Sequence, residues 1–253
     1  MRLTSIINVW ADCVELLPFC IANHLKFCDG VIVVWSQHSN HFVKNDAVLE
    51  YILANGHDSR VEFVQLEPMK GLKPLANETR KRNHGIEIAK KKGFDQVLIS
   101  DADEFWYSDT MNQLKIELEH EEKLNGFVHP LRVFIKSPTL WCEDHTLVPG
   151  IQRLTKKFYV GNFSHYPYAY EGLTARIDPS RRPNTLTGIK YVGVPMSHMS
   201  YVRKDIDLKI NNSSANLKKS REAIHEQVRN AVPGYKSGYG ILKECPNYFN
   251  IVI

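Results

Sequence analysis

Two aspartates, Asp101 and Asp103, follow an apolar run and are the residues of this 253-residue chain whose type and spacing best suit chemistry. The run at 96–100 reads QVLIS, which is typical of a buried strand. In extended backbone the side chains at i and i+2 point the same way, so the two carboxylates repel each other unless a cation lies between them. Oxygen ligands with open coordination positions suit Mg²⁺ or Mn²⁺ bound jointly with substrate phosphates. The pattern therefore predicts a divalent metal site, and the alternative is an acidic loop that caps the next helix.

The surroundings of this motif carry a family resemblance. The segment GFDQVLISDADEF (93–105) follows a basic helix that contains Arg80, Arg82 and Asn83. Together they resemble the DxD region of GT-A glycosyltransferases, particularly those of family 2. In that family the acidic side chains hold a divalent ion that bridges the diphosphate of a nucleotide sugar. The resemblance implies that Asp101 and Asp103 bind Mn²⁺ or Mg²⁺, and it makes Arg80 the first choice for a phosphate contact or for orienting the motif.

The opening of the chain is similar to the nucleotide-binding half of the same family. Ile6–Trp10 is followed by Glu15, and VIVVWSQHSN (31–40) ends in a polar turn, where Gln37, His38 and Asn40 replace acidic residues that are common there. The residues that the resemblance implies for donor binding are Trp10, Glu15, Ser39, Arg80, Asn83, Asp101 and Arg203.

A second matching stretch, SHMSYVRK (197–204), resembles the His-x-x-Tyr-Val-Arg segment that many such enzymes carry after their last core strand. The resemblance implies that His198 completes the metal site or meets the diphosphate, and a neutral imidazole is able to ligate Mn²⁺. Arg203 and Lys204 are expected to neutralise the leaving diphosphate, with two solvated charges as the alternative.

For a catalytic base, the segment WCEDH (141–145) stands where inverting family members carry an acidic residue on an acceptor-side loop. A carboxylate there could deprotonate the acceptor hydroxyl, and Asp144 is preferred to Glu143, with Glu171 in reserve. The aromatic stretch FSHYPYAYEG (163–172) could stack on a sugar or a base, or belong to the core.

The elements that would position these residues alternate in the first half of the chain. Periodicity predicts strands at 3–10, 31–35, 61–66 and 96–100, and helices at 14–25, 43–55 and 76–92. This order implies a mostly parallel sheet with helices on both faces and ligands outside the carboxyl ends of its strands. After residue 125, runs at 126–135, 155–163 and 187–194 predict an antiparallel extension, and a helix is expected near 217–231. We therefore expect an α/β fold of the GT-A type in a single domain (1–253), with a nucleotide-sugar half (1–107), an acceptor half (108–204) and a helical tail (205–253).

Composition narrows the protein class. The chain is 43% hydrophobic and 24% charged, as in an ordinary globular protein. Its five cysteines include no CxxC pair, and its start resembles no signal peptide, so we expect a cytoplasmic location. The net charge of +4 tolerates an anionic partner without demonstrating one.

Together these features predict a metal-dependent glycosyltransferase that moves a sugar from a nucleoside diphosphate to a hydroxyl acceptor. The acceptor could be a glycan or a lipid-linked sugar. It could also be a hydroxymethylated pyrimidine in DNA, which the basic clusters at 80–82, 156–157, 181–182 and 218–219 permit. The alternatives from other classes are a metal-dependent phosphoesterase or nuclease, and a non-catalytic module with this fold.

Overall fold

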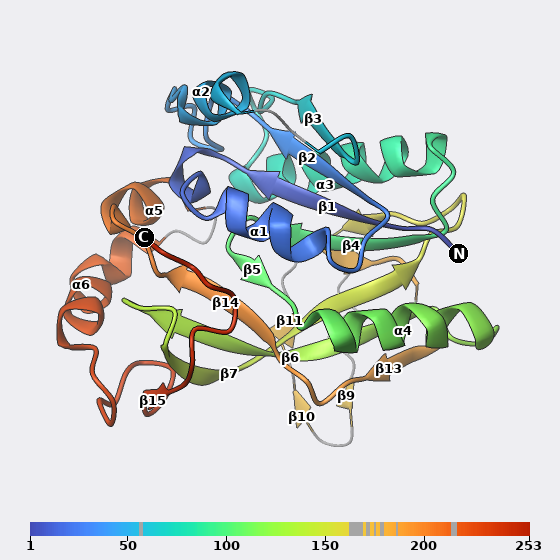
Figure 1. The fold of residues 1–253 in the computed structure, drawn as a ribbon. Coiled ribbons are helices and arrows are strands. Elements are labelled where there is room, and N and C mark those ends of the chain that lie inside the picture. The colour runs from blue at the N-terminus through green and yellow to red at the C-terminus, as the bar shows by residue number, and fades with distance from the viewer. Residues whose placement is uncertain are drawn as a thin grey trace.

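Four parallel strands form one half of the main sheet (Figure 1). They are β1 (Leu3–Val9), β2 (Gly30–Trp35), β3 (Val61–Gln65) and β4 (Gln96–Asp101), in the order β3-β2-β1-β4. The computed structural model describes residues 1–55, 58–161, 169–170, 173–174, 176–177, 180–185, 187–213 and 217–253. The expected fold class, a mostly parallel sheet flanked by helices with a small antiparallel part, is confirmed.

The three central strands, β1, β2 and β4, are buried on both faces because helices cover each side. The α-helices of the described chain as a whole are α1 (Leu17–His24), α2 (Ala47–Ala54), α3 (Pro74–Lys91), α4 (Ser108–His120), α5 (Ile206–Asn212) and α6 (Arg221–Asn230). Ile6 of β1 faces α3, whereas its neighbour Ile7 faces α1, as the alternation of a strand requires. Gly85 lets α3 approach closely, since a Cβ there would lie 2.4 Å from the Cγ2 of Ile6.

The second half of the sheet is mixed. Strand β4 pairs antiparallel with β7 (Leu140–Arg153), and β7 pairs antiparallel with β6 (Gly126–Ile135). Strand β14 (Met196–Tyr201) then runs parallel to β6 and antiparallel to the short β5 (Glu104–Phe105). This last pairing sets His198 opposite Glu104 and so brings the distant 197–204 segment beside the acidic motif.

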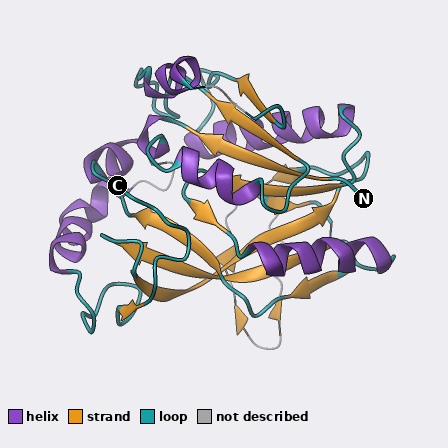
Figure 2. Cartoon of the chain, in the orientation of Figure 1, coloured by secondary structure: helices purple, strands orange, loops and turns teal. Residues whose placement is uncertain are grey.

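Several predicted elements differ from those observed (Figure 2). The loop expected at 141–145 is part of β7, the longest strand, whose polar residues and whose Pro149 and Gly150 hide the strand pattern. Of the strands expected at 155–163 and 187–194, the described residues form only β8 (Val160–Gly161) and β13 (Ile189–Tyr191). The last helix begins with a 3-10 turn at Leu217–Ser220, and α4 and α5 were not predicted.

The remaining strands each have two residues. They are β9 (Ala169–Tyr170), β10 (Leu173–Thr174), β11 (Arg176–Ile177), β12 (Arg182–Pro183) and β15 (Lys243–Glu244). Strands β11 and β15 both pair with β7 and widen the second half of the sheet. Among the described residues, no helix combines the length and the apolar character that crossing a membrane requires.

Candidate active site

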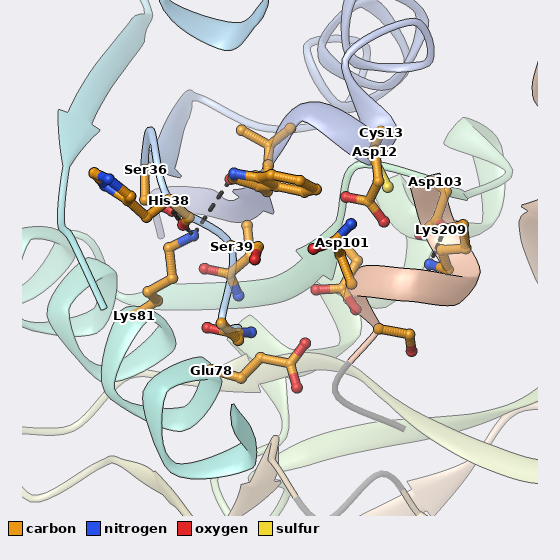
Figure 3. Close-up of a pocket in the computed structure, with 16 residues that line it drawn as sticks. Asp12, Cys13, Ser36, His38, Ser39, Glu78, Lys81, Asp101, Asp103 and Lys209 are labelled. Atoms are coloured by element: carbon orange, nitrogen blue, oxygen red, sulfur yellow. Dashed lines mark hydrogen bonds and ion pairs between the residues drawn. The ribbon is translucent and has the colours of Figure 1, made fainter. Parts of the chain in front are cut away.

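A pocket opens at the carboxyl ends of β1, β2 and β4 and is also lined by α3 and α5 (Figure 3). Lys81, Ser36 and His38 lie at one end, and Asp103 and Lys209 lie at the other. We call these the Lys81 end and the Asp103 end. The pocket thus occupies the edge of the sheet where α/β proteins generally bind ligands.

Asp101 is held in place by a cation from α3. Arg82 Nη2 donates to both Asp101 oxygens, at 2.8 and 3.0 Å, and the Arg82 side chain is fully buried. The Asp101 side chain remains 27% exposed and lines the pocket. Sequence reasoning chose Arg80 for this role, but Arg80 donates to the backbone oxygen of Glu67 and does not line the pocket.

Asp103 is buried and surrounded by positive charge from the distal part of the chain. Its Oδ2 accepts hydrogen bonds from Arg203 Nη2 at 2.8 Å and from Lys209 Nζ at 3.1 Å. Burial alone would raise the pKa of Asp103, but the neighbouring Lys209, His198 and Arg203 side chains hold this pKa well below its ordinary value. Asp103 is therefore ionised, and its charge is balanced within the protein.

Arg203 lies behind the pocket wall, not on its surface. It also donates to the backbone oxygen of Asp12 and to the sulfur of Cys13, and its side chain is fully buried. The expected direct contact between Arg203 and a diphosphate therefore has no path in this structure. Lys209 does line the pocket, and the Asp103 carboxylate raises its pKa despite the opposing effect of burial.

Two of the three predicted metal ligands, Asp103 and His198, lie together, and of these two Asp103 lines the pocket whereas His198 does not. Asp103 Oδ1 is 3.4 Å from His198 Nε2, and no other described residue makes a hydrogen bond to this oxygen. Two neighbouring ligands of an octahedral ion, each about 2.1 Å from it, are about 3.0 Å apart, so the pair fits a small divalent ion after a slight adjustment. Within the described ranges, no three His, Cys, Asp or Glu side chains could hold an ion unaided. The remaining ligands would have to come from water or from a substrate.

Glu104, the residue after Asp103, has contacts that serve the fold and not the pocket. Its carboxylate is fully buried and forms two hydrogen bonds with Arg181, at 2.6 and 2.7 Å. It also accepts hydrogen bonds from Ser100 Oγ and from the backbone N–H of Asp101. Glu104 does not line the pocket, and its contacts fix the turn that carries both aspartates.

Lys81 and Asn8 line the pocket but were not predicted. Lys81 is 6% exposed and Asn8 is 8% exposed. A signal for Lys81 was available, since it stands four residues before the tightly packed Gly85 and so lies on the buried face of α3. Asn8 gave no such signal because an asparagine at the end of an apolar run is typical of a turn.

The other residues expected to bind the donor divide into two groups. Trp10 and Ser39 line the pocket; the indole N–H of Trp10 donates to the backbone oxygen of Gln37. Glu15 and Asn83 do not line it. Glu15 accepts from the backbone N–H of Lys204, and Asn83 pairs with the backbone of β8 at Val160. Both therefore connect elements around the site.

The expected catalytic bases lie elsewhere. Glu143 and Asp144 belong to β7 and do not line the pocket. Glu143 is exposed and lies 3.3 Å from Lys243 Nζ, while Asp144 accepts from the backbone N–H of Thr146. Glu171, with most of the aromatic stretch at 163–172, lies outside the described residues.

No family model matches the chain, and no curated protein matches it either. Among solved structures, S. aureus TarS 1-349 is 14% identical, with 91% of this chain and 71% of that chain covered and a TM-score of 0.49. A longer S. aureus TarS structure is 15% identical with a TM-score of 0.47; the match covers 91% of this chain and 43% of that one. A cytidylyltransferase from Leptospira borgpetersenii is 12% identical, with 91% and 97% covered and a TM-score of 0.42. Similarity at this level carries no information about what this chain binds, so its function must be argued from the pocket.

Proposed function

We propose that this protein is a glycosyltransferase that takes its sugar from a nucleoside diphosphate. The observation that carries the proposal is the composition of one pocket at the carboxyl edge of the sheet. It joins an anchored Asp101, a buried Asp103, the Lys209 ammonium and the aromatic Trp10. A nucleotide sugar needs all these features, because its base stacks, its ribose takes hydrogen bonds and its diphosphate requires positive charge.

Asp103 Oδ1 and His198 Nε2 are the atoms we propose to hold a divalent ion, Mn²⁺ or Mg²⁺. When bound, such an ion would withdraw negative charge from the departing diphosphate. The rest of the work belongs to the chain itself. Lys209 supplies a fixed positive charge at the same end of the pocket, and Arg82 holds Asp101 toward the pocket, where a ribose hydroxyl could donate to it.

In the transfer, an acceptor hydroxyl oxygen forms a bond to the anomeric carbon while the bond from that carbon to the diphosphate breaks. The acceptor proton leaves, and the electron pair of the broken bond stays with the diphosphate. Positive groups fixed before the reaction stabilise this developing charge without reorganisation. Lys209, which Asp103 holds in position at the pocket, is such a group at the Asp103 end.

The acceptor is a hydroxyl compound, and a sugar hydroxyl suits the described surface better than DNA. Two of the four basic clusters that permitted DNA are largely withdrawn from the surface, because Lys81 and Arg82 at 80–82 are buried and Arg181 at 181–182 forms a buried ion pair with Glu104. The distinction is measurable, since binding to DNA weakens with added salt through counterion release and binding of a small sugar does not.

A thermal-shift panel tests the proposal. Wild type is heated with UDP-, GDP-, CMP- and TDP-sugars, with and without Mn²⁺, and the panel is repeated on Asp103→Ala. A donor should raise the melting temperature of wild type only with the metal, by the mass-action effect of a ligand that binds the native state, and should fail on the variant. If no nucleotide shifts the melting of wild type, the proposal is wrong.

A further inference from the structure

Two polar side chains that line the pocket, Lys81 and Asn8, have no role in the proposed function as described so far. Lys81 Nζ donates to Ser36 Oγ at 2.9 Å and lies 3.3 Å from the backbone oxygen of Val9. Both partners are uncharged, so no carboxylate within the described ranges makes a hydrogen bond to this buried ammonium. Burial lowers the pKa of Lys81 to about 8. At neutral pH a charged donor therefore stands at the pocket with its charge balanced only at a distance.

Asn8, at the end of β1, is the second unused group. It is 92% buried, and neither its amide nitrogen nor its amide oxygen has a hydrogen-bond partner among the described residues. Leaving a buried amide without partners costs about 1–3 kcal/mol. In the sheet, Asn8 is paired with Asp101 on one side and with Val34 on the other, so its side chain lies in the floor of the pocket.

The two ends of the pocket suit different parts of a nucleotide. Asp103 and Lys209 mark the end for the diphosphate, as proposed above. At the Lys81 end, the backbone oxygen of Val9 and the hydroxyl of Ser36 hold the Lys81 ammonium, and the Trp10 ring lines the same pocket. One ammonium among neutral groups and a ring suits a planar base with a carbonyl edge. Asp101 lies between the ends (Figure 3), where a ribose would fall.

This inference rests on the proposed function. We propose that Lys81 and Asn8 both bind the edge of the donor's base, and that Lys81 selects a base with a carbonyl beside a ring N–H over one with an amino group. Lys81 donates to the carbonyl oxygen, and Asn8 accepts from the ring N–H through its amide oxygen. An amino base would direct an N–H donor at an ammonium that has no lone pair to accept it. Asn8 can turn its amide to suit either edge, so Lys81 makes the distinction.

Isothermal titration calorimetry in the presence of Mn²⁺, with two matched pairs of nucleotides, tests this assignment. UDP and CDP differ at the carbonyl-or-amino edge of a pyrimidine, and IDP and ADP differ at the same edge of a purine. The proteins are wild type, Lys81→Met, Asn8→Leu and the control Lys91→Met, which removes an exposed lysine from the same helix. Thermal unfolding of each variant without nucleotide verifies that it folds.

In whichever pair binds, wild type and Lys91→Met should prefer the carbonyl member by about tenfold or more, because a buried donor facing a donor leaves both unpaired. Lys81→Met should reduce this preference to less than about threefold, and Asn8→Leu should weaken both members. If wild type shows no preference, or Lys81→Met keeps it, the assignment is overturned while the proposed function stands. If no nucleotide binds wild type, the proposed function fails and the assignment fails with it.

Discussion

The two ends of the pocket both present buried positive charge, yet they use it differently. At the Asp103 end, Arg203 and Lys209 converge on one carboxylate, so the cations and the anion hold each other in position. At the Lys81 end, the ammonium has only neutral hydrogen-bond partners, and Asn8, which lines the same pocket, has no partner among the described residues. A satisfied network makes a site rigid, whereas an unsatisfied one costs stability until a ligand binds. The first end is thus assembled in advance, and the second is prepared for a ligand.

The largest effect should come from breaking the network at the Asp103 end. Asp103→Asn leaves the buried charge of Arg203 without its partner, and removal of one member of such a pair typically costs about 3–5 kcal/mol. Urea unfolding should show this loss, together with loss of nucleotide binding. The control is Asp109→Asn at an exposed position of α4, which should change the free energy of unfolding by less than about 0.5 kcal/mol. Equal losses for the two variants would contradict this account of Asp103.

A smaller effect on function is expected at Glu104, which has a structural role outside both ends of the pocket. Glu104→Gln should lower the free energy of unfolding by about 2–4 kcal/mol because it breaks the buried pair with Arg181. Nucleotide affinity, measured by calorimetry at a temperature where the variant is folded, should change little. Adding Arg181→Met should recover part of the lost stability, since the double variant leaves no buried charge unpaired. A total loss of binding with unchanged stability would instead make Glu104 part of the site.

At the Lys81 end we expect a substitution to raise the free energy of unfolding instead of lowering it. Lys81→Met should stabilise the protein without nucleotide by about 1–2 kcal/mol at neutral pH, since a buried charge is replaced by an apolar chain. Four carboxylates favour the charged form of Lys81 and so partly offset the effect of burial on its pKa; in decreasing order of effect they are Glu78, Asp12, Glu67 and Asp101.

The pH dependence follows from the pKa of about 8 for Lys81 in the folded state, below the ordinary value of 10.5. Between these two values the unfolded chain binds more protons than the folded chain, so rising pH stabilises wild type relative to the variant. The advantage of Lys81→Met in thermal unfolding should therefore be full below about pH 8 and shrink toward pH 10. A constant advantage across this range would show that folding does not lower the pKa of Lys81, because the folded and unfolded chains would then bind the same number of protons.

The smallest effect is expected at Asp144, which lies at neither end of the pocket. Asp144→Asn keeps an acceptor for the backbone N–H of Thr146, so stability should change by less than about 0.5 kcal/mol. Nucleotide affinity should be unchanged, and transfer should stay within about twofold of wild type. A fall of about a hundredfold in turnover would restore Asp144 as a general base.

Much of the fold could be predicted, because β2 is a nearly continuous apolar run, β1 and β4 each contain a shorter one, and the helices between them end at recognisable positions. The missed strand β7 carries Glu143 and Asp144 beside its buried Cys142, so its pattern resembles a loop. Within the site, the motif was predictable, but its partners were not. Arg82 and Arg80 are the same residue type on one helix, and only the burial of one face of α3 makes Arg82 the partner of Asp101. Lys209 contacts Asp103 because folding brings together two segments that are 106 positions apart in the sequence.

Hydrogen–deuterium exchange with and without a nucleoside diphosphate and Mn²⁺ tests the central claim most directly, because it locates the bound nucleotide. We expect slower exchange in residues 8–13, 36–40 and 206–213, which together line both ends of the pocket. Exchange on β15 and α6, which do not line it, should stay unchanged. Slower exchange confined to regions outside the pocket, with a nucleotide shown to be bound, would contradict the account.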